Sequence, residues 1–212
     1  MDLKAKQMWE DFLNPEVLRF RLAISSIYIV TFEALKDSIT DHIKTFFWTG
    51  FEDGKEVLDQ KYESDVLSRN RSPVHASLEW LQERKAIDDK DIESFVRVKD
   101  CRNKLAHGLL KVVTKDGIPS DFEERFQEMV ALMKKIDHWW IINFEIPINS
   151  DFDGKEIDEE QIMSGRLMSL LVLYDIALGS PEKSSYYHDE FRKRCDENQA
   201  NTTKERPAHD ER

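Results

Sequence analysis

NPEVLRFRLAISSIYIVTFEALKDSITDHIKTFF, residues 14–47, is the segment on which the predicted fold class depends. Its apolar side chains recur every three or four positions, the spacing that brings them to one face of an α-helix. Pro15 suits the first turn of a helix, and Asn14 suits the N-cap position before it. The periodic residues are Val17, Phe20, Ile24, Ile27, Leu35, Ile39, Ile43 and Phe46. The pattern predicts one long amphipathic helix that runs from Pro15 most of the way to Gly50.

Four further segments show helical periodicity. These helices are expected to begin near residues 73, 89, 122 and 159, each after a Ser or Asp that can cap it. Asp158 and Gln161 resemble a capping box for the last helix, which is expected to end at Gly179. Residues 51–72 are expected to form a loop with a short helix, and residues 109–120 either a short hairpin or a loop. With no series of alternating strands, the sequence predicts an all-α bundle of about five helices.

The composition changes after Gly179. Residues 181–212 are polar, and one Phe and two Tyr are their only large apolar side chains. Such a segment buries too little apolar surface to offset the entropy lost on ordering. We therefore expect a helical bundle over residues 1–180 and a polar, mobile tail over residues 181–212.

The composition also argues against several classes of protein. A net charge of −11 over 212 residues disfavours a general nucleic-acid binder. Cys101 and Cys195 offer neither a disulfide framework nor metal-ligand spacing, which favours a reducing compartment. The N-terminal residues lack the apolar run of a signal peptide, and the longest apolar stretch, residues 22–32, is too short to cross a bilayer. We expect a cytoplasmic protein with no metal, no cofactor and no membrane contact.

The predicted helix from residue 89 to 109 carries a charged residue on its apolar face. At about 100° per residue, Arg102 falls among Phe95, Val98 and Leu105. A guanidinium in a buried position is costly unless a partner compensates it. Either Arg102 is paired with an acidic residue of a neighbouring helix, or it faces a site that opens between subunits.

Two other polar residues follow Arg102 on the same helix. Asn103 and His107 are four positions apart and are therefore neighbours at the edge of the apolar stripe. The helix is expected to end at His107–Gly108. Residues 97–116 hold six basic residues and two acidic ones, a local charge of +4 that suits contact with phosphate.

The segment RNKLAHG, residues 102–108, resembles the motif of HEPN domains: an arginine, a polar residue that is often asparagine, and a histidine on a late helix of an all-α bundle. The resemblance covers the motif and the helical architecture over roughly residues 15–180. A second match to the Arg–His spacing, RNRSPVH from Arg69 to His75, contains Pro73 and precedes a helix. We interpret that second match as due to chance.

Catalytic HEPN proteins are metal-independent ribonucleases that act as dimers, with the two motifs meeting at the interface. The resemblance implies that Arg102 stabilises phosphate charge, that His107 is the general acid or base, and that Asn103 orients the histidine or the phosphate. It also implies a homodimer, an RNA substrate and a 2′,3′-cyclic phosphate product. The residues expected to bind RNA are Lys99, Lys104 and Lys111.

One position departs from the family pattern. In HEPN toxins silenced by a nucleotidyltransferase antitoxin, a tyrosine stands two residues after the histidine, where this chain has Leu109. The departure puts that kind of partner in doubt and leaves open another antitoxin or regulatory protein. The expected roles are toxin–antitoxin function, phage defence or RNA processing.

A non-catalytic dimerisation or partner-binding protein is the alternative. In that case Arg102 pairs within the chain and His107 only complements the helix dipole. The two hypotheses differ in a structural prediction. The nuclease requires Arg102 and His107 exposed in a cleft at a two-fold interface, whereas burial of Arg102 against an intramolecular carboxylate would exclude it.

Overall fold

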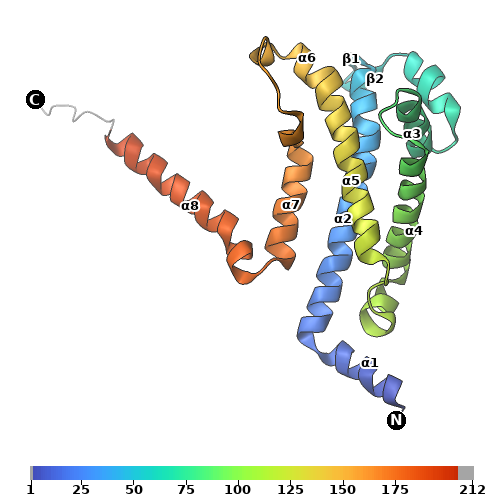
Figure 1. Ribbon diagram of the computed structural model, residues 1–212, viewed down its shortest axis with the longest axis vertical. Helices are drawn as coiled ribbons and strands as arrows, with labels where there is room; N and C mark the ends of the chain where they lie inside the picture. Colours follow the sequence, from blue (N-terminus) through green and yellow to red (C-terminus); the bar gives the residue numbers. More distant parts are fainter. Residues whose placement is uncertain (1, 205–212) are drawn as a thin grey trace, which may run out of the picture. The chain divides into compact units, whose positions relative to one another are not determined.

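The computed structural model describes residues 2–204, and this part of the chain is mostly helical (Figure 1). Its helices and strands are α1 (Leu3–Leu13), α2 (Pro15–Phe46), β1 (Trp48–Glu52), β2 (Lys55–Leu58), α3 (Pro73–Glu83), α4 (Asp89–Lys111), α5 (Phe122–Trp140), α6 (Ile146–Ile148), α7 (Gly165–Leu178) and α8 (Pro181–Lys204). Short 3-10 or π-helical turns span Tyr62–Val66, Leu67–Arg69, Val112–Asp116, Ile141–Glu145, Ser150–Phe152 and Glu159–Gln161. The all-α class is confirmed, although the described range holds eight α-helices rather than about five.

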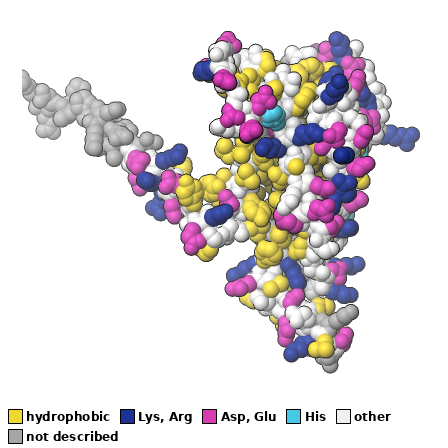
Figure 2. Space-filling view, in the orientation of Figure 1, with side chains coloured by type: hydrophobic (Ala, Val, Ile, Leu, Met, Phe, Trp, Pro, Cys, Tyr) yellow, Lys and Arg dark blue, Asp and Glu magenta, His cyan; other side chains and the backbone are white. Residues whose placement is uncertain are grey.

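The chain divides into two compact units, with the boundary between Ser169 and Leu170, inside α7. In the first unit α2, α4 and α5 each contact the other two, and α3 packs on α2 (Figure 1). In the second unit the Tyr187 hydroxyl of α8 donates a hydrogen bond to Asp175 of α7 at 3.0 Å. Acidic and basic side chains are interspersed over the surface of the first unit (Figure 2).

Helix α2 confirms the prediction from residues 14–47. The Asn14 side chain accepts hydrogen bonds from two backbone N–H groups of the first turn, and Pro15 occupies the first helical position. Two residues assigned to the apolar face, Phe20 and Phe46, are exposed instead. The largest fully buried side chains of the first unit include Tyr28, Leu35, Ile39, Trp80, Phe95, Leu105, Met129 and Ile136. Each of the apolar ones stabilises the fold by about 1.5–3 kcal/mol.

A hairpin lies where the sequence analysis expected a loop. Strands β1 and β2 pair antiparallel and are joined by Asp53–Gly54, whose φ angles are +50° and +75°. Asp–Gly is the dipeptide favoured in such two-residue turns, because both positions require positive φ. The alternative hairpin around residues 116–117 does not form, since helical backbone continues through Asp116.

Helix α4 begins as predicted and ends later than predicted. Asp88 accepts hydrogen bonds from the backbone N–H groups of Lys90 and Asp91, and the Asp91 side chain accepts one from the Asp88 N–H, which completes a capping box. The helix does not stop at Gly108 but runs to Lys111. His107 is therefore an interior helical residue, not one at the C-terminus.

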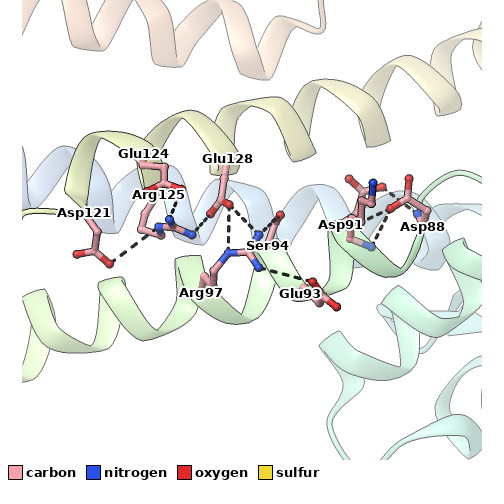
Figure 3. Close-up of polar contacts among 10 residues, drawn as sticks. Asp88, Asp91, Glu93, Ser94, Arg97, Asp121, Glu124, Arg125 and Glu128 are labelled. Carbon is pink, nitrogen blue, oxygen red and sulfur yellow. Dashed lines mark hydrogen bonds and ion pairs between the residues drawn. The ribbon is translucent and has the colours of Figure 1, made fainter.

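Ion pairs join the solvent side of α4 to α5 (Figure 3). Arg97 of α4 and Arg125 of α5 each reach Glu128 at 2.7 Å. Near the start of α4, Lys135 pairs with Asp88 at 3.1 Å and also with Asp91. The pairs of Arg97 and Lys135 connect α4 to α5 and are partly exposed, so each contributes at most about 1 kcal/mol. The pair of the buried Arg125 with Glu128 lies within α5.

The C-terminal region differs from the prediction in two places. Asp158 does cap a helix, but only the single turn Glu159–Gln161, and α7 starts later at Gly165. Residues 181–204, expected to be a mobile tail, form helix α8, while residues 205–212 lie outside the described range. Pro181 suits the first turn of α8, and no Gly or Pro interrupts residues 182–204. The helix propensity of residues 181–204 thus supports α8, although these residues bury little apolar surface.

Candidate functional site

Arg102 lies at the margin of the buried face of α4, not at its centre. Its side chain is 27% exposed. The buried residues of α4 are Phe95, Val98, Cys101 and Leu105. At about 100° per residue, their mean direction around the helix axis differs from that of Arg102 by about 45°. The sequence analysis placed Arg102 among Phe95, Val98 and Leu105 and left out Cys101, whose burial moves the centre of the face away from Arg102.

The Arg102 guanidinium is only partly satisfied by neighbouring side chains. Nη2 donates to Glu33 Oε1 of α2 at 2.7 Å, and Nη1 donates to Asn103 Oδ1 at 3.3 Å. The guanidinium carbon is 5.6 Å from the centroid of the Phe32 ring. Nε is buried and has no acceptor among the described residues. Buried N–H groups are normally hydrogen-bonded, so Nε is an unsatisfied donor within the described residues.

Glu33 is shared between two cations. Its other carboxylate oxygen pairs with Lys36, one turn further along α2. The hydrogen bond from Lys36 lowers the pKa of Glu33, burial opposes this, and the bond from Arg102 lowers the pKa further, so that the net shift is downward. An intramolecular carboxylate is therefore present, as the structural alternative required. However, Glu33 is 40% exposed, and the pair lies at the surface.

Beside this pair a pocket of about 200 Å³ opens between α2, α3 and α4. Its lining residues are Phe32, Lys36, Ser72, Val74, His75, Phe95, Lys99, Arg102 and Asn103. Three of these are cations and none is a carboxylate, so Lys36, Lys99, Arg102 and the adjacent Glu33 together carry a charge of +2. A concave site with this balance favours anions.

The pocket contains half of the predicted site residues. It brings together Lys99, Arg102 and Asn103. His107 lies about 140° around α4 from Arg102 and ~7.5 Å further along its axis, on the exposed surface. The remaining predicted RNA-binding residues, Lys104 and Lys111, are also exposed and outside the pocket. Within one chain, then, Arg102 and His107 do not face a common cavity.

Three polar residues of the pocket were missed by the sequence analysis: Lys36, Ser72 and His75. No pattern in the sequence around Lys36 or Ser72 indicates that they belong to the pocket, because only the packing of the helices places them near Arg102. His75 belongs to the match that was interpreted as due to chance. The arginine of that match, Arg69, pairs elsewhere with Glu83, so the spacing has no meaning as a motif even though its histidine lines the pocket.

A second polar cluster surrounds Asp137, which is only 3% exposed. Its carboxylate accepts hydrogen bonds from the Ser38 and Ser164 hydroxyls and lies 3.6 Å from His42 Nε2. Burial raises the pKa of Asp137, but hydrogen bonds from His42 and the two serines outweigh burial and leave the pKa below its ordinary value. A nucleophilic triad requires a hydrogen bond between the serine hydroxyl and the imidazole. Here both serine hydroxyls donate to Asp137 instead. The cluster attaches the segment before α7 to the bundle.

No family model, curated protein or solved structure matches this chain. The HEPN resemblance rests on residues 102–108 and on the helical architecture. Within residues 2–204, no helix combines the length and the hydropathy needed to cross a bilayer. Over the same range, no three His, Cys, Asp or Glu side chains are grouped so that they could hold a metal ion.

Proposed function

We propose that the chain is a metal-independent endoribonuclease of the HEPN type that acts as a homodimer in the cytoplasm, in toxin–antitoxin function or phage defence. The observation that supports this proposal most is the cationic pocket, in which Lys99, Arg102 and Asn103 lie together at the surface. Arginine and lysine bind phosphate oxygens through charge-assisted hydrogen bonds. The partly exposed Arg102 fork is suited to contact an RNA phosphate.

The exposed side of α4 offers a surface for pairing two copies. Val96, Asn103, His107 and Leu110 point in directions within about 60° of one another. Val96 and Leu110 are 42% and 77% exposed, and they flank the two polar residues of the motif. A two-fold interface is self-complementary. Pairing through this surface would bury both apolar side chains and bring two copies of His107 into one cleft.

The proposed reaction is the attack of a ribose 2′-hydroxyl on the adjacent phosphate. Arg102 and Lys99 would stabilise the charge that develops on the phosphate oxygens, and Asn103 would orient the phosphate or the histidine. One His107 would accept the proton of the 2′-hydroxyl, and the His107 of the partner subunit would protonate the leaving 5′-oxygen. The product would carry a 2′,3′-cyclic phosphate, and the scheme uses neither metal nor cofactor.

A non-catalytic dimerisation or partner-binding protein is the second candidate. The observation that favours it is the 2.7 Å ion pair between Arg102 and Glu33, which gives the guanidinium a partner within its own chain. On this reading Arg102 joins α4 to α2, and the exposed surface of α4 binds another protein.

Cleavage of a mixed RNA pool in EDTA tests the two candidates. We expect the wild type to cleave and to leave cyclic-phosphate ends. His107→Ala and Arg102→Ala should each lose about 100-fold or more in rate, whereas Lys90→Ala, on the same helix outside the pocket, should keep its rate. Circular dichroism and sedimentation would confirm that each variant is folded and has the wild-type oligomeric state.

Two outcomes of this assay would contradict the nuclease. Equal cleavage by all variants would remove Arg102 and His107 from the mechanism. A folded wild type that cleaves no RNA in the pool would favour the partner-binding protein.

A further inference from the structure

The pocket contains a histidine that the HEPN motif does not supply. His75 lies in the first turn of α3 and is half-buried. Its ring packs edge-on against Phe95, with centroids 5.6 Å apart and an angle of 86° between the planes. No hydrogen bond or ion pair with another described residue engages its ring nitrogens. The packing holds the ring in place, and the nitrogens remain available to a ligand.

Three of the side chains that line the pocket with His75 are cations, which favour an anion. Lys36 comes from α2, and Lys99 and Arg102 come from α4. Glu33, paired with Lys36 and Arg102, is the carboxylate next to this group. Positive charge thus surrounds a volume that admits a phosphate group.

The backbone of α3 adds further donors to the same wall. The first N–H groups of a helix have no acceptor within the helix, and here they belong to Val74 and His75, since Pro73 has none. The Ser72 side chain at the N-cap makes no capping hydrogen bond to them. Helix N-termini favour anions through these donors and through the helix dipole. These N–H groups and the three cations all belong to one chain.

We infer that this pocket binds a phosphate group of the RNA substrate, and that His75 is a proton-transfer residue facing that phosphate. The assignment to RNA rests on the proposed ribonuclease function, whereas the anion site rests on the pocket alone. In the cleavage step the 2′-oxygen–phosphorus bond forms as the bond from phosphorus to the 5′-oxygen breaks. One histidine takes the proton of the 2′-hydroxyl and another gives a proton to the 5′-oxygen, so the step needs no further reactant.

A catalytic His75 changes which subunit supplies each histidine. The motif alone supplies one histidine per chain, so two must meet across the dimer. With His75, each chain supplies a histidine and an arginine at the same phosphate. His107 of that chain does not face the pocket, so the second histidine would be the partner's His107. Each phosphate then requires one copy of His107 rather than two.

The binding site is tested first with probes that are not cleaved. Uridine 3′-monophosphate and inorganic phosphate would be titrated into the full-length wild type while the imidazole NMR signals of His75 are followed. We expect both probes to shift these signals. Lys99→Ala should weaken binding about tenfold, and Lys90→Ala should leave it unchanged. His75 signals that do not move, or equal affinities in the two lysine variants, would overturn the anion site.

The proton-transfer role is tested by His75→Phe, which keeps a ring against Phe95 and removes the ring nitrogens. We expect its kcat for RNA to fall about 100-fold or more with little change in KM, and its melting temperature to stay near that of the wild type. His188→Ala, an exposed histidine outside the pocket, serves as the control and should retain activity.

The failures of the two proposals can be told apart. A wild type that cleaves RNA, with His75→Phe cleaving equally fast, would overturn the role of His75 and leave the ribonuclease intact. A wild type that cleaves no RNA but whose His75 signals respond to both probes would end the ribonuclease proposal. In that case the pocket would stand as a binding site for phosphate or a small phosphate monoester.

Discussion

Replacing Glu33 with Gln separates the structural role of its ion pairs from the role of the pocket. The substitution keeps the size of the side chain and an acceptor oxygen for Arg102, but removes the negative charge between Arg102 and Lys36. If the pocket binds anions, its local charge rises from +2 to +3. If the pair exists to stabilise the fold, the free energy of unfolding should fall instead.

The effect on stability is expected to be small. Arg102 and Glu33 are 27% and 40% exposed, and ion pairs open to solvent contribute about 0–1 kcal/mol. For a chain of this length about 1 kcal/mol corresponds to roughly 2–4 °C in the melting temperature. The lowered pKa of Glu33 means that its contribution is complete above its ordinary pKa and is lost as the pH falls through the folded-state pKa. Wild type and Glu33→Gln should therefore differ at pH 7 and converge in acid.

The effect on binding has the opposite sign. A unit charge at about 4 Å is worth about 1 kcal/mol in water, which corresponds to roughly fivefold in affinity. Titration with inorganic phosphate at low salt should show this gain for Glu33→Gln. Asp37→Asn, which removes an exposed carboxylate from the same helix, is the control for net charge. A fall in unfolding free energy of about 3 kcal/mol or more, or no gain in phosphate affinity over Asp37→Asn, would refute this reasoning.

Three further substitutions test the fold around the site. Asp137→Ala removes the shared acceptor of two serine hydroxyls and should lower the free energy of unfolding by about 2–4 kcal/mol. Since the pKa of Asp137 is lowered, the wild type should also lose this stability in acid. A decrease of less than about 1 kcal/mol, measured by thermal unfolding, would contradict the prediction. Gly108→Ala adds a Cβ that meets no atom within 4 Å inside α4, so urea unfolding should show a gain of about 0.5–1 kcal/mol, and a loss would indicate that another surface packs there. Tyr28→Phe removes a buried hydrogen bond of 3.1 Å to the Val98 carbonyl and should cost about 1–2 kcal/mol in the same assay, with an unchanged midpoint as the contrary result.

The sequence predicts the features of this fold that depend on neighbouring residues. Asn14 and Asp88 cap α2 and α4 as expected, because an N-cap acts over only three positions. The hairpin turn at Asp53–Gly54 also carries a local signal, but its strands are too short to show clear alternation. Helix α8 was missed because burial was weighed and local propensity was not.

The candidate site depends on contacts that no local pattern contains. Lys99, Arg102 and Asn103 share a face of one helix, so their proximity could be predicted from spacing. The other polar residues of the pocket, Lys36 and His75, come from segments far apart in the sequence, and only the packing of α2 and α3 against α4 places them there. The ion pair of Arg102 was anticipated as an alternative, but its carboxylate could not be named without the fold.

The pocket is built from three separate stretches of the chain, residues 32–36, 72–75 and 95–103. An anion held there would join α2, α3 and α4 in the way that a cross-link does, although no covalent bond forms. Binding to the folded state alone raises its stability in proportion to the logarithm of ligand concentration. Local opening of α3 would remove one wall and release the anion. Occupancy of the pocket and docking of α3 are then linked equilibria, and hydrogen exchange in the first turn of α3 would report the linkage.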